Sequence, residues 1–175
     1  MQVNNFAGKT IGLMVASGFD EDEFIAIQRA MLAKTATLKI ISRDAGLTNS
    51  WNGSGWGMSY PVDSTLSTTL AIDYDALIIP KGARHVETLM NEAHAKRVLR
   101  AFLREDMPVM IMTEAIRLLG LVEDHATRAI DFSGENAEVA VDKNLVQIPL
   151  GTTLESGLEK LNDVMVASAG ESQAA

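Results

Sequence analysis

Three short and predominantly apolar runs constrain the fold of this chain more than any other feature. They span Thr10 to Val15, Ala76 to Pro80 and Val109 to Met112. Each run is long enough for a strand but too short for a helix. A strand that lacks polar alternation is covered on both faces, as the central strands of a parallel sheet are. The runs therefore predict a sheet that is buried on both sides.

Segments with helical periodicity lie between these strands. Glu21 to Leu32 and Glu92 to Arg104 repeat apolar residues at the spacing of a helix that packs on a sheet. Further elements are expected at Ala36 to Ile41 (strand), Ala83 to Met90 (helix), Val139 to Val141 with Leu145 to Ile148 (hairpin) and Thr153 to Val166 (helix). This alternation predicts an α/β fold, with a mostly parallel sheet and helices on both faces.

Length and charge limit the number of domains and the kinds of partner that the chain is expected to have. The 175 residues, 47% of them hydrophobic, are expected to form one domain over residues 1–167, followed by a disordered tail at 168–175. A net charge of -8 repels phosphate backbones and anionic lipid, which disfavours nucleic-acid and membrane-surface roles. The N-terminus does not resemble a signal peptide, and no apolar run approaches the roughly 20 residues of a membrane helix. We expect a soluble, cytoplasmic protein.

The chain contains no cysteine, so it has no disulfide, no thiolate metal site and no cysteine nucleophile. Its three histidines are His85, His94 and His125, and their spacing does not suggest a metal site. We therefore expect neither a metal nor a cofactor. His85 follows the third strand, and we expect it to have a structural role rather than a catalytic one.

Thr113 and Glu114 directly follow the apolar strand that ends at Met112. Ligands and catalytic groups collect at such strand ends in open α/β sheets. Thr113 could cap the following helix, with Glu114 in its first turn, and this is the interpretation we favour. Alternatively, Glu114 or Glu23 could act as the base for a threonine nucleophile, if burial raised the pKa of that carboxyl group.

Glu23 belongs to an acidic cluster after the first strand. Asp20 stands three residues before it, which is close to a capping box, and acids in a first turn favour the helix dipole. Glu23 could also line a pocket at the strand end. The two roles can coexist.

Both tryptophans, Trp51 and Trp56, lie in the glycine- and serine-rich segment 49–59. Such a segment is flexible, whereas an indole carries a large apolar area. The segment could be a lid or a partner surface. Alternatively, the indoles fold back onto the sheet edge or into a dimer contact.

Four landmarks occur in order along the chain: GFDEDEF (18–24), IIPKG (78–82), PVMIMTEAIRLL (108–119) and KNLVQIPLGTTLE (143–155). Together they resemble the DJ-1/PfpI superfamily, which is class I glutamine-amidotransferase-like. The resemblance implies a flavodoxin-like three-layer sandwich, commonly a homodimer, and many members are cysteine-dependent hydrolases, glyoxalases or protein-repair enzymes. Two features more closely resemble the C-terminal domain of large-subunit catalases, which has this fold without an established active site. They are the x-P-x-G turn within IIPKG and the elbow, the sharp strand-to-helix turn at Thr113, which has no cysteine here.

The elbow of active members, A-I-C-H-G, falls on residues 111–115, so that Thr113 replaces the cysteine and Glu114 the histidine. The elbow cysteine has a positive φ, which is costly for a β-branched residue, and we therefore expect Thr113 to relax the elbow. A second histidine of the family falls on Ile130, with His125 nearby in sequence.

The resemblance also places Glu23 at the position of a glutamate that, in the family, forms a hydrogen bond with the elbow cysteine. The oxyanion turn P-G-G becomes PKG at residues 80–82, with backbone donors expected at Gly82 and Glu114.

These features predict a diverged and non-catalytic member that binds a small ligand or a protein partner and forms homodimers. A stress-related role is one such function. One alternative is a glyoxalase, amidase or hydrolase that uses Glu23 and Glu114 for proton transfer. Another is an interaction module whose surface is the segment containing Trp51 and Trp56.

Overall fold

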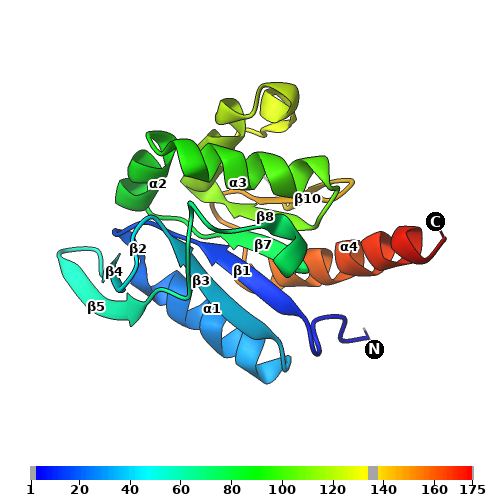
Figure 1. The fold of residues 1–175 in the computed structure, drawn as a ribbon, viewed down its shortest axis with the longest axis horizontal. Coiled ribbons are helices and arrows are strands. Elements are labelled where there is room, and N and C mark those ends of the chain that lie inside the picture. Colours follow the sequence, from blue (N-terminus) through cyan, green and yellow to red (C-terminus); the bar gives the residue numbers. More distant parts are fainter. Residues whose placement is uncertain (1–2, 134–137, 175) are drawn as a thin grey trace.

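A seven-stranded sheet runs through the centre of the molecule (Figure 1). The computed structural model describes residues 3–133 and 138–174. The strand order is β6-β3-β1-β7-β8-β10-β9, and every neighbouring pair is parallel except β9 with β10. The strands are β1 (Thr10–Met14), β3 (Thr37–Ser42), β6 (Ser64–Thr65), β7 (Ala76–Ile79), β8 (Val109–Met112), β9 (Ala140–Asp142) and β10 (Leu145–Ile148).

Helices cover both faces of this sheet and complete the predicted flavodoxin-like sandwich. In Figure 1, α2 (Ala83–Met90) and α3 (Ala93–Arg104) lie above the sheet, and α1 (Glu21–Ala33) and α4 (Leu154–Ala174) lie below it. The 3-10 helix η2 (Thr113–Leu121) packs into the same core as α2 and α3. Two shorter 3-10 helices are η1 (Ala71–Asp73) and η3 (Glu123–Arg128).

Strand β8 shows why the central strands are apolar throughout. Val109 and Ile111 pack into the core under α2 and α3, whereas Met110 and Met112 pack into the core with α1 and α4. All four side chains are buried. Full burial of one such side chain contributes roughly 1.5–3 kcal/mol, so a polar residue at any of these positions would weaken one of the two cores.

Two elements differ from the sequence-based boundaries. The last helix was expected to end at Val166 but continues to Ala174. Three of the eight residues from 167 to 174 are alanine, the strongest helix former. The helix after the elbow is of the 3-10 type, with tighter turns than the spacing suggested.

The tryptophan segment is a β-hairpin rather than a flexible loop. Strands β4 (Leu47–Trp51) and β5 (Trp56–Pro61) pair with each other, and β2 (Phe19–Asp20) joins them in a three-stranded sheet. Glu21 fastens the hairpin to α1, because its Oε2 accepts hydrogen bonds from Ser50 Oγ (2.6 Å) and from the Met58 amide (2.8 Å). These two bonds hold the pKa of Glu21 below its ordinary value.

No helix among the described residues is both long enough and apolar enough to cross a membrane.

Candidate functional site

Loops from three adjacent strands meet at one edge of the sheet. Strands β1, β7 and β8 are neighbours, and their carboxyl ends are followed by the segment that leads into the acidic first turn of α1, by the PKG turn at 80–82 and by the elbow at Thr113. The topology therefore brings Glu23, Gly82 and Glu114 to the same edge of the sheet.

Thr113 keeps the positive φ of an elbow, with a value of 49°. The prediction that threonine would relax the elbow is therefore wrong. Strand β8 is paired on both sides, and Ala115 and Ile116 of η2 are buried, so the chain is fixed on either side of Thr113. Surrounding structure of this kind can hold a residue in a costly conformation. The favoured capping role is also wrong, since η2 has no side-chain cap.

We expect Thr113→Gly to raise the free energy of unfolding by about 1 kcal/mol, because glycine adopts a positive φ without a steric cost. Urea denaturation measures the change. Thr113→Val is the matched control, since it removes the hydroxyl but keeps the β-branch, and it should give no such gain. A glycine variant no more stable than the native protein would show that the elbow stores no strain.

Two backbone amides of the PKG turn donate hydrogen bonds to carboxylates. The Lys81 amide donates to Glu23 Oε1 (2.7 Å), and the Gly82 amide donates to Glu114 Oε1 (2.6 Å). The Gly82 donor expected from the sequence is thus present but already has an anionic acceptor within the protein. Each bond is short, as is usual for an amide that donates to a charged group.

Burial controls the electrostatics of Glu23, whose side chain is only 12% exposed. Loss of solvation raises its pKa to about 7, and the charges of Asp20 and Glu114 act in the same direction. The Lys81 amide opposes the shift, as does the Lys81 ammonium at 4.0 Å. Glu23 therefore changes its charge near neutral pH.

Helix capping and contact with the PKG turn are carried out by different residues of the acidic cluster. Asp20 caps α1 by accepting from the Glu23 amide at 2.9 Å. The Glu23 side chain does not complete a capping box but reaches the Lys81 amide. The Asp20 amide in turn donates to the Lys81 carbonyl at 3.0 Å, which joins the loops after β1 and β7.

His85 is fully buried and has a structural role, as the sequence predicted. Its Nε2 lies 2.6 Å from the Pro80 carbonyl, which can only accept, so Nε2 carries the proton. Its Nδ1 then accepts from the Ala16 amide at 3.4 Å. Burial lowers the pKa of the imidazole to about 4. The neutral ring bridges the ends of β1 and β7, and both nitrogens are used.

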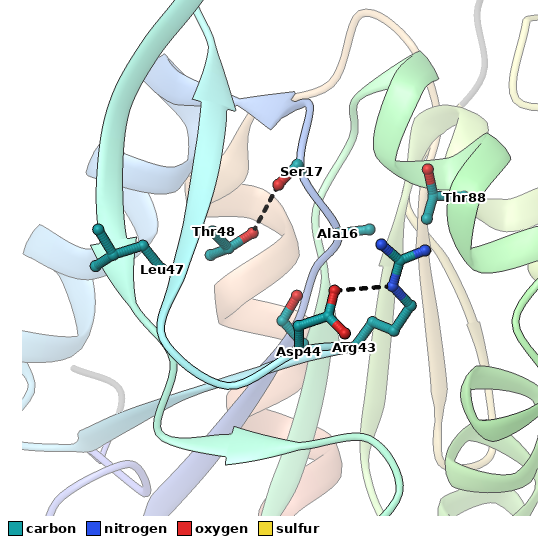
Figure 2. A pocket seen from close by; sticks show the side chains of 8 residues that line it. Ala16, Ser17, Arg43, Asp44, Leu47, Thr48 and Thr88 are labelled. Carbon is teal, nitrogen blue, oxygen red and sulfur yellow. Dashed lines mark hydrogen bonds and ion pairs between the residues drawn. The ribbon is translucent and has the colours of Figure 1, made fainter.

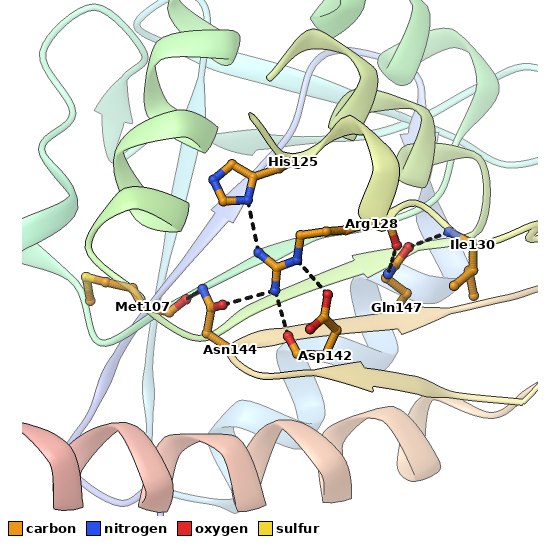
Figure 3. Close-up of polar contacts among 7 residues, drawn as sticks. All are labelled: Met107, His125, Arg128, Ile130, Asp142, Asn144 and Gln147. Atoms are coloured by element: carbon orange, nitrogen blue, oxygen red, sulfur yellow. Dashed lines mark hydrogen bonds and ion pairs between the residues drawn. The ribbon is translucent and has the colours of Figure 1, made fainter. Parts of the chain in front are cut away.

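His125 and Ile130 do not supply an imidazole to the elbow. The His125 ring accepts from Arg128 Nη1 at 3.0 Å, and Arg128 also binds Asp142 through Nε at 2.7 Å (Figure 3). The Ile130 amide donates to Gln147 Oε1 at 3.0 Å. These bonds fasten η3 and the segment after it to β9 and β10.

The indoles of the hairpin pack on each other and on helix α2. Trp51 and Trp56 meet edge to face, with ring centroids 5.3 Å apart. The guanidinium of Arg84 lies 4.0 Å from the centre of the Trp51 ring, within the range of a cation–π contact. Trp56 remains 57% exposed. The hairpin thus buries one indole in part and presents the other to solvent.

A cavity of about 120 Å³ opens beside the end of β1, between the hairpin and α2 (Figure 2). Ser17, Thr48 and Thr88 contribute hydroxyls to it, and Arg43 and Asp44 lie at its side. Sequence reasoning missed this site. The local signal was the placement of Ser17 shortly after β1 and of Arg43 directly after β3, whereas Thr48 and Thr88 are brought to the cavity by tertiary folding.

No group of three or more histidine, aspartate or glutamate side chains within residues 3–133 and 138–174 is arranged to hold a metal ion.

Comparison with known proteins identifies the family. The profile of the DJ-1/PfpI family matches residues 9–130. The chain belongs to this family. Solved structures share its fold, including that of the VC2308 protein (TM-score 0.73, 17% identity, 93% of this chain and 92% of that chain covered). DJ-1 of Schizosaccharomyces pombe gives a TM-score of 0.67 at 17% identity, with 93% and 97% covered.

A cysteine-to-alanine mutant of the DJ-1 superfamily protein STM1931 from Salmonella typhimurium gives a TM-score of 0.65 at 18% identity, with 95% of this chain and 91% of that chain covered. No curated protein matches the chain. At these identities the structural likeness concerns the fold, whereas the chemistry depends on the residues described above.

Proposed function

We propose that this DJ-1/PfpI family protein is non-catalytic and binds a small ligand. One observation carries the proposal: the amides of Lys81 and Gly82 already donate to the carboxylates of Glu23 and Glu114. An oxyanion hole works because its donors are free to bind charge that develops on the substrate. Here a developing oxyanion would compete with two acceptors and be repelled by their negative charge.

The residues at the elbow support the same conclusion. A threonine hydroxyl needs an adjacent base to become a nucleophile. The one histidine that lies between β1 and β7 is His85, which is buried and uses both ring nitrogens in structural contacts. Thr113 therefore has the backbone of a nucleophile elbow without the groups that activate it.

One observation favours an enzyme that uses carboxylates instead. A pKa of about 7 for Glu23 is suited to general acid–base catalysis at neutral pH. In this alternative, Glu23 transfers protons on a small carbonyl or amide substrate, with Glu114 as the second carboxylate.

Turnover assays distinguish the two proposals. We expect no saturable turnover of methylglyoxal, of glutamine or of a p-nitrophenyl ester by the native protein. Thr113→Ala and Glu23→Gln are the test variants, and Thr37→Ala, at an exposed position on β3, is the matched control. Saturable turnover that Thr113→Ala abolishes would contradict the non-catalytic proposal. Turnover that only Glu23→Gln abolishes would establish the carboxylate mechanism.

The homodimer, a protein partner, a stress-related role and a cytoplasmic location stay predictions. Sedimentation equilibrium tests the first of them, since it gives the mass of the particle directly, against 18.9 kDa for one chain.

A further inference from the structure

The cavity beside β1 continues into a second and more open depression. Ser17 and Thr88 line both, so that the two form one groove along the carboxyl edge of the sheet. The first part adds Arg43, Asp44 and Thr48, and the second adds Arg84, Glu87 and Trp56. In open α/β sheets, ligands bind outside the carboxyl ends of the strands. The groove lies apart from the carboxylates of the elbow, which do not line it.

Hydroxyl groups dominate the inner end of the groove. Ser17 Oγ and Thr48 Oγ1 share a long hydrogen bond of 3.5 Å (Figure 2), and Ser17 Oγ also accepts from the Asn49 amide at 3.2 Å. Each oxygen has two lone pairs, so both hydroxyls can still accept from a ligand hydroxyl. Thr88 Oγ1 donates to the Arg84 carbonyl at 3.2 Å, which leaves its lone pairs able to accept. A hydroxyl both donates and accepts, so these side chains match a ligand that does the same.

The charged residues of the groove balance one another. Arg43 Nε donates to Asp44 Oδ2 at 3.0 Å, and in Figure 2 its guanidinium extends toward Thr88. Arg84 and Glu87 contribute one charge of each sign to the outer part. An anion or a cation would be attracted by two of these groups and repelled by the other two, so the groove offers neither ion a net attraction that would offset the cost of removing its charge from water. A neutral ligand avoids this cost and can still bond to every one of these groups.

An exposed indole completes the outer end. Trp56 is 57% exposed although it lines the groove, and its neighbour Trp51 is held under Arg84 at 4.0 Å. A rigid aromatic face offers a large apolar area with little loss of conformational entropy. The groove therefore combines hydroxyls and paired charges with one flat apolar wall.

We propose that this groove binds a small, neutral, polyhydroxylated molecule of the sugar class. The ligand hydroxyls bond to Ser17, Thr48 and the Arg43–Asp44 pair, while a carbon face of the ligand packs on Trp56. The assignment rests on the proposed function, since it names the site and the ligand class of a non-catalytic binding protein.

The experiment is a titration of the native protein with D-ribose and D-glucose, followed by tryptophan fluorescence and by calorimetry. We expect saturable binding, with a dissociation constant on the order of 1 mM or lower. Thr48→Val and Trp56→Ser should each weaken it at least tenfold. Glucose 6-phosphate should bind more weakly than glucose, because its phosphate would lose hydration in a groove whose positive and negative side chains balance.

Matched controls keep the test specific. Thr37→Val removes a hydroxyl from an exposed strand position, and Met58→Ser removes an exposed apolar side chain from β5, the strand of Trp56. Neither control should alter binding. Ser17→Ala provides a second groove variant if Thr48→Val fails to fold. No saturable binding of either sugar, or binding that the groove variants do not change, would overturn the inference.

The outcomes also separate this inference from the proposed function. Absence of sugar binding together with absence of turnover would remove the groove assignment and leave the non-catalytic proposal in place. Turnover that depends on Thr113 would remove the non-catalytic proposal, and the titration would still decide whether the groove binds sugars.

Discussion

Glu23→Gln is expected to raise the free energy of unfolding by about 3 kcal/mol at pH 8. Burial raises the pKa of Glu23 from 4.5 to about 7. Each pKa unit corresponds to about 1.4 kcal/mol, so holding this group charged costs the folded state roughly 3 kcal/mol above pH 7. Glutamine is neutral at every pH, and its side-chain oxygen can still accept from the Lys81 amide. The variant should therefore keep the bond without the cost of burying a charge.

The sign of the pH dependence follows from the raised pKa. The folded protein holds the Glu23 proton more tightly than the unfolded chain does, so below pH 4.5 protonation removes the penalty. As pH rises from 4.5 to about 7 the native protein loses this contribution, and above 7 the loss is complete. The stability difference between Glu23→Gln and the native protein should grow through that window and then level off.

Urea denaturation between pH 4.5 and 8.5 measures this difference, and the comparison cancels groups that titrate equally in both proteins. Glu21→Gln is the matched control on the same helix. Hydrogen bonds from Ser50 and Met58 lower the pKa of Glu21, so its removal should destabilise the protein, and that difference should change only at acidic pH. A Glu23→Gln difference that is constant from pH 4.5 to 8.5 would mean that Glu23 titrates normally.

The retention of a buried carboxylate has a consequence for function. Proteins commonly keep destabilising groups where binding or chemistry needs them. Thr113 and Glu114 stand at the elbow in place of a cysteine and a histidine. The Lys81 amide donates to Glu23, and the Gly82 amide donates to Glu114. The pair thus takes the place of a bound anion at these two amides and fixes the turn by hydrogen bonds from within the protein.

Local sequence determines the buried strands and the helix start. Strand β8 is apolar at all four positions because both faces are covered, and this can be predicted without a structure. Asp20 caps α1 because of its position alone. The family resemblance added the order in which the loops meet, and so placed Glu23 near Gly82 and Glu114.

Tertiary interactions determine what the sequence could not predict. The positive φ of Thr113 opposes its local preference and results from packing on both sides of the elbow. The bond from Gly82 to Glu114 joins residues that are 32 positions apart. The hairpin of Trp51 and Trp56 is ordered because Glu21 and Arg84 bind it from other elements, and its glycines and serines alone suggested flexibility.

Gly18→Ala is expected to lower the free energy of unfolding by about 3 kcal/mol or more. Gly18 has a φ of 104°, which costs any L-residue energy. A Cβ at this position would also overlap Arg84 Cβ and approach the backbone nitrogen of His85 to 3.2 Å. Neither of these atoms is the free end of a flexible side chain, so α2 itself would have to move.

Gly53→Ala separates the two contributions to this cost. Gly53 has nearly the same φ, 101°, but a Cβ there would meet nothing within 4 Å. Its variant should lose only the conformational part, on the order of 1–2 kcal/mol. Thermal unfolding should therefore show a clearly larger decrease in Tm for Gly18→Ala, at about 2–4 °C for each kcal/mol. Equal decreases would mean that α2 yields freely beside Gly18. In that case Arg84 would not hold the hairpin and the groove in a fixed geometry, because both depend on the position of α2.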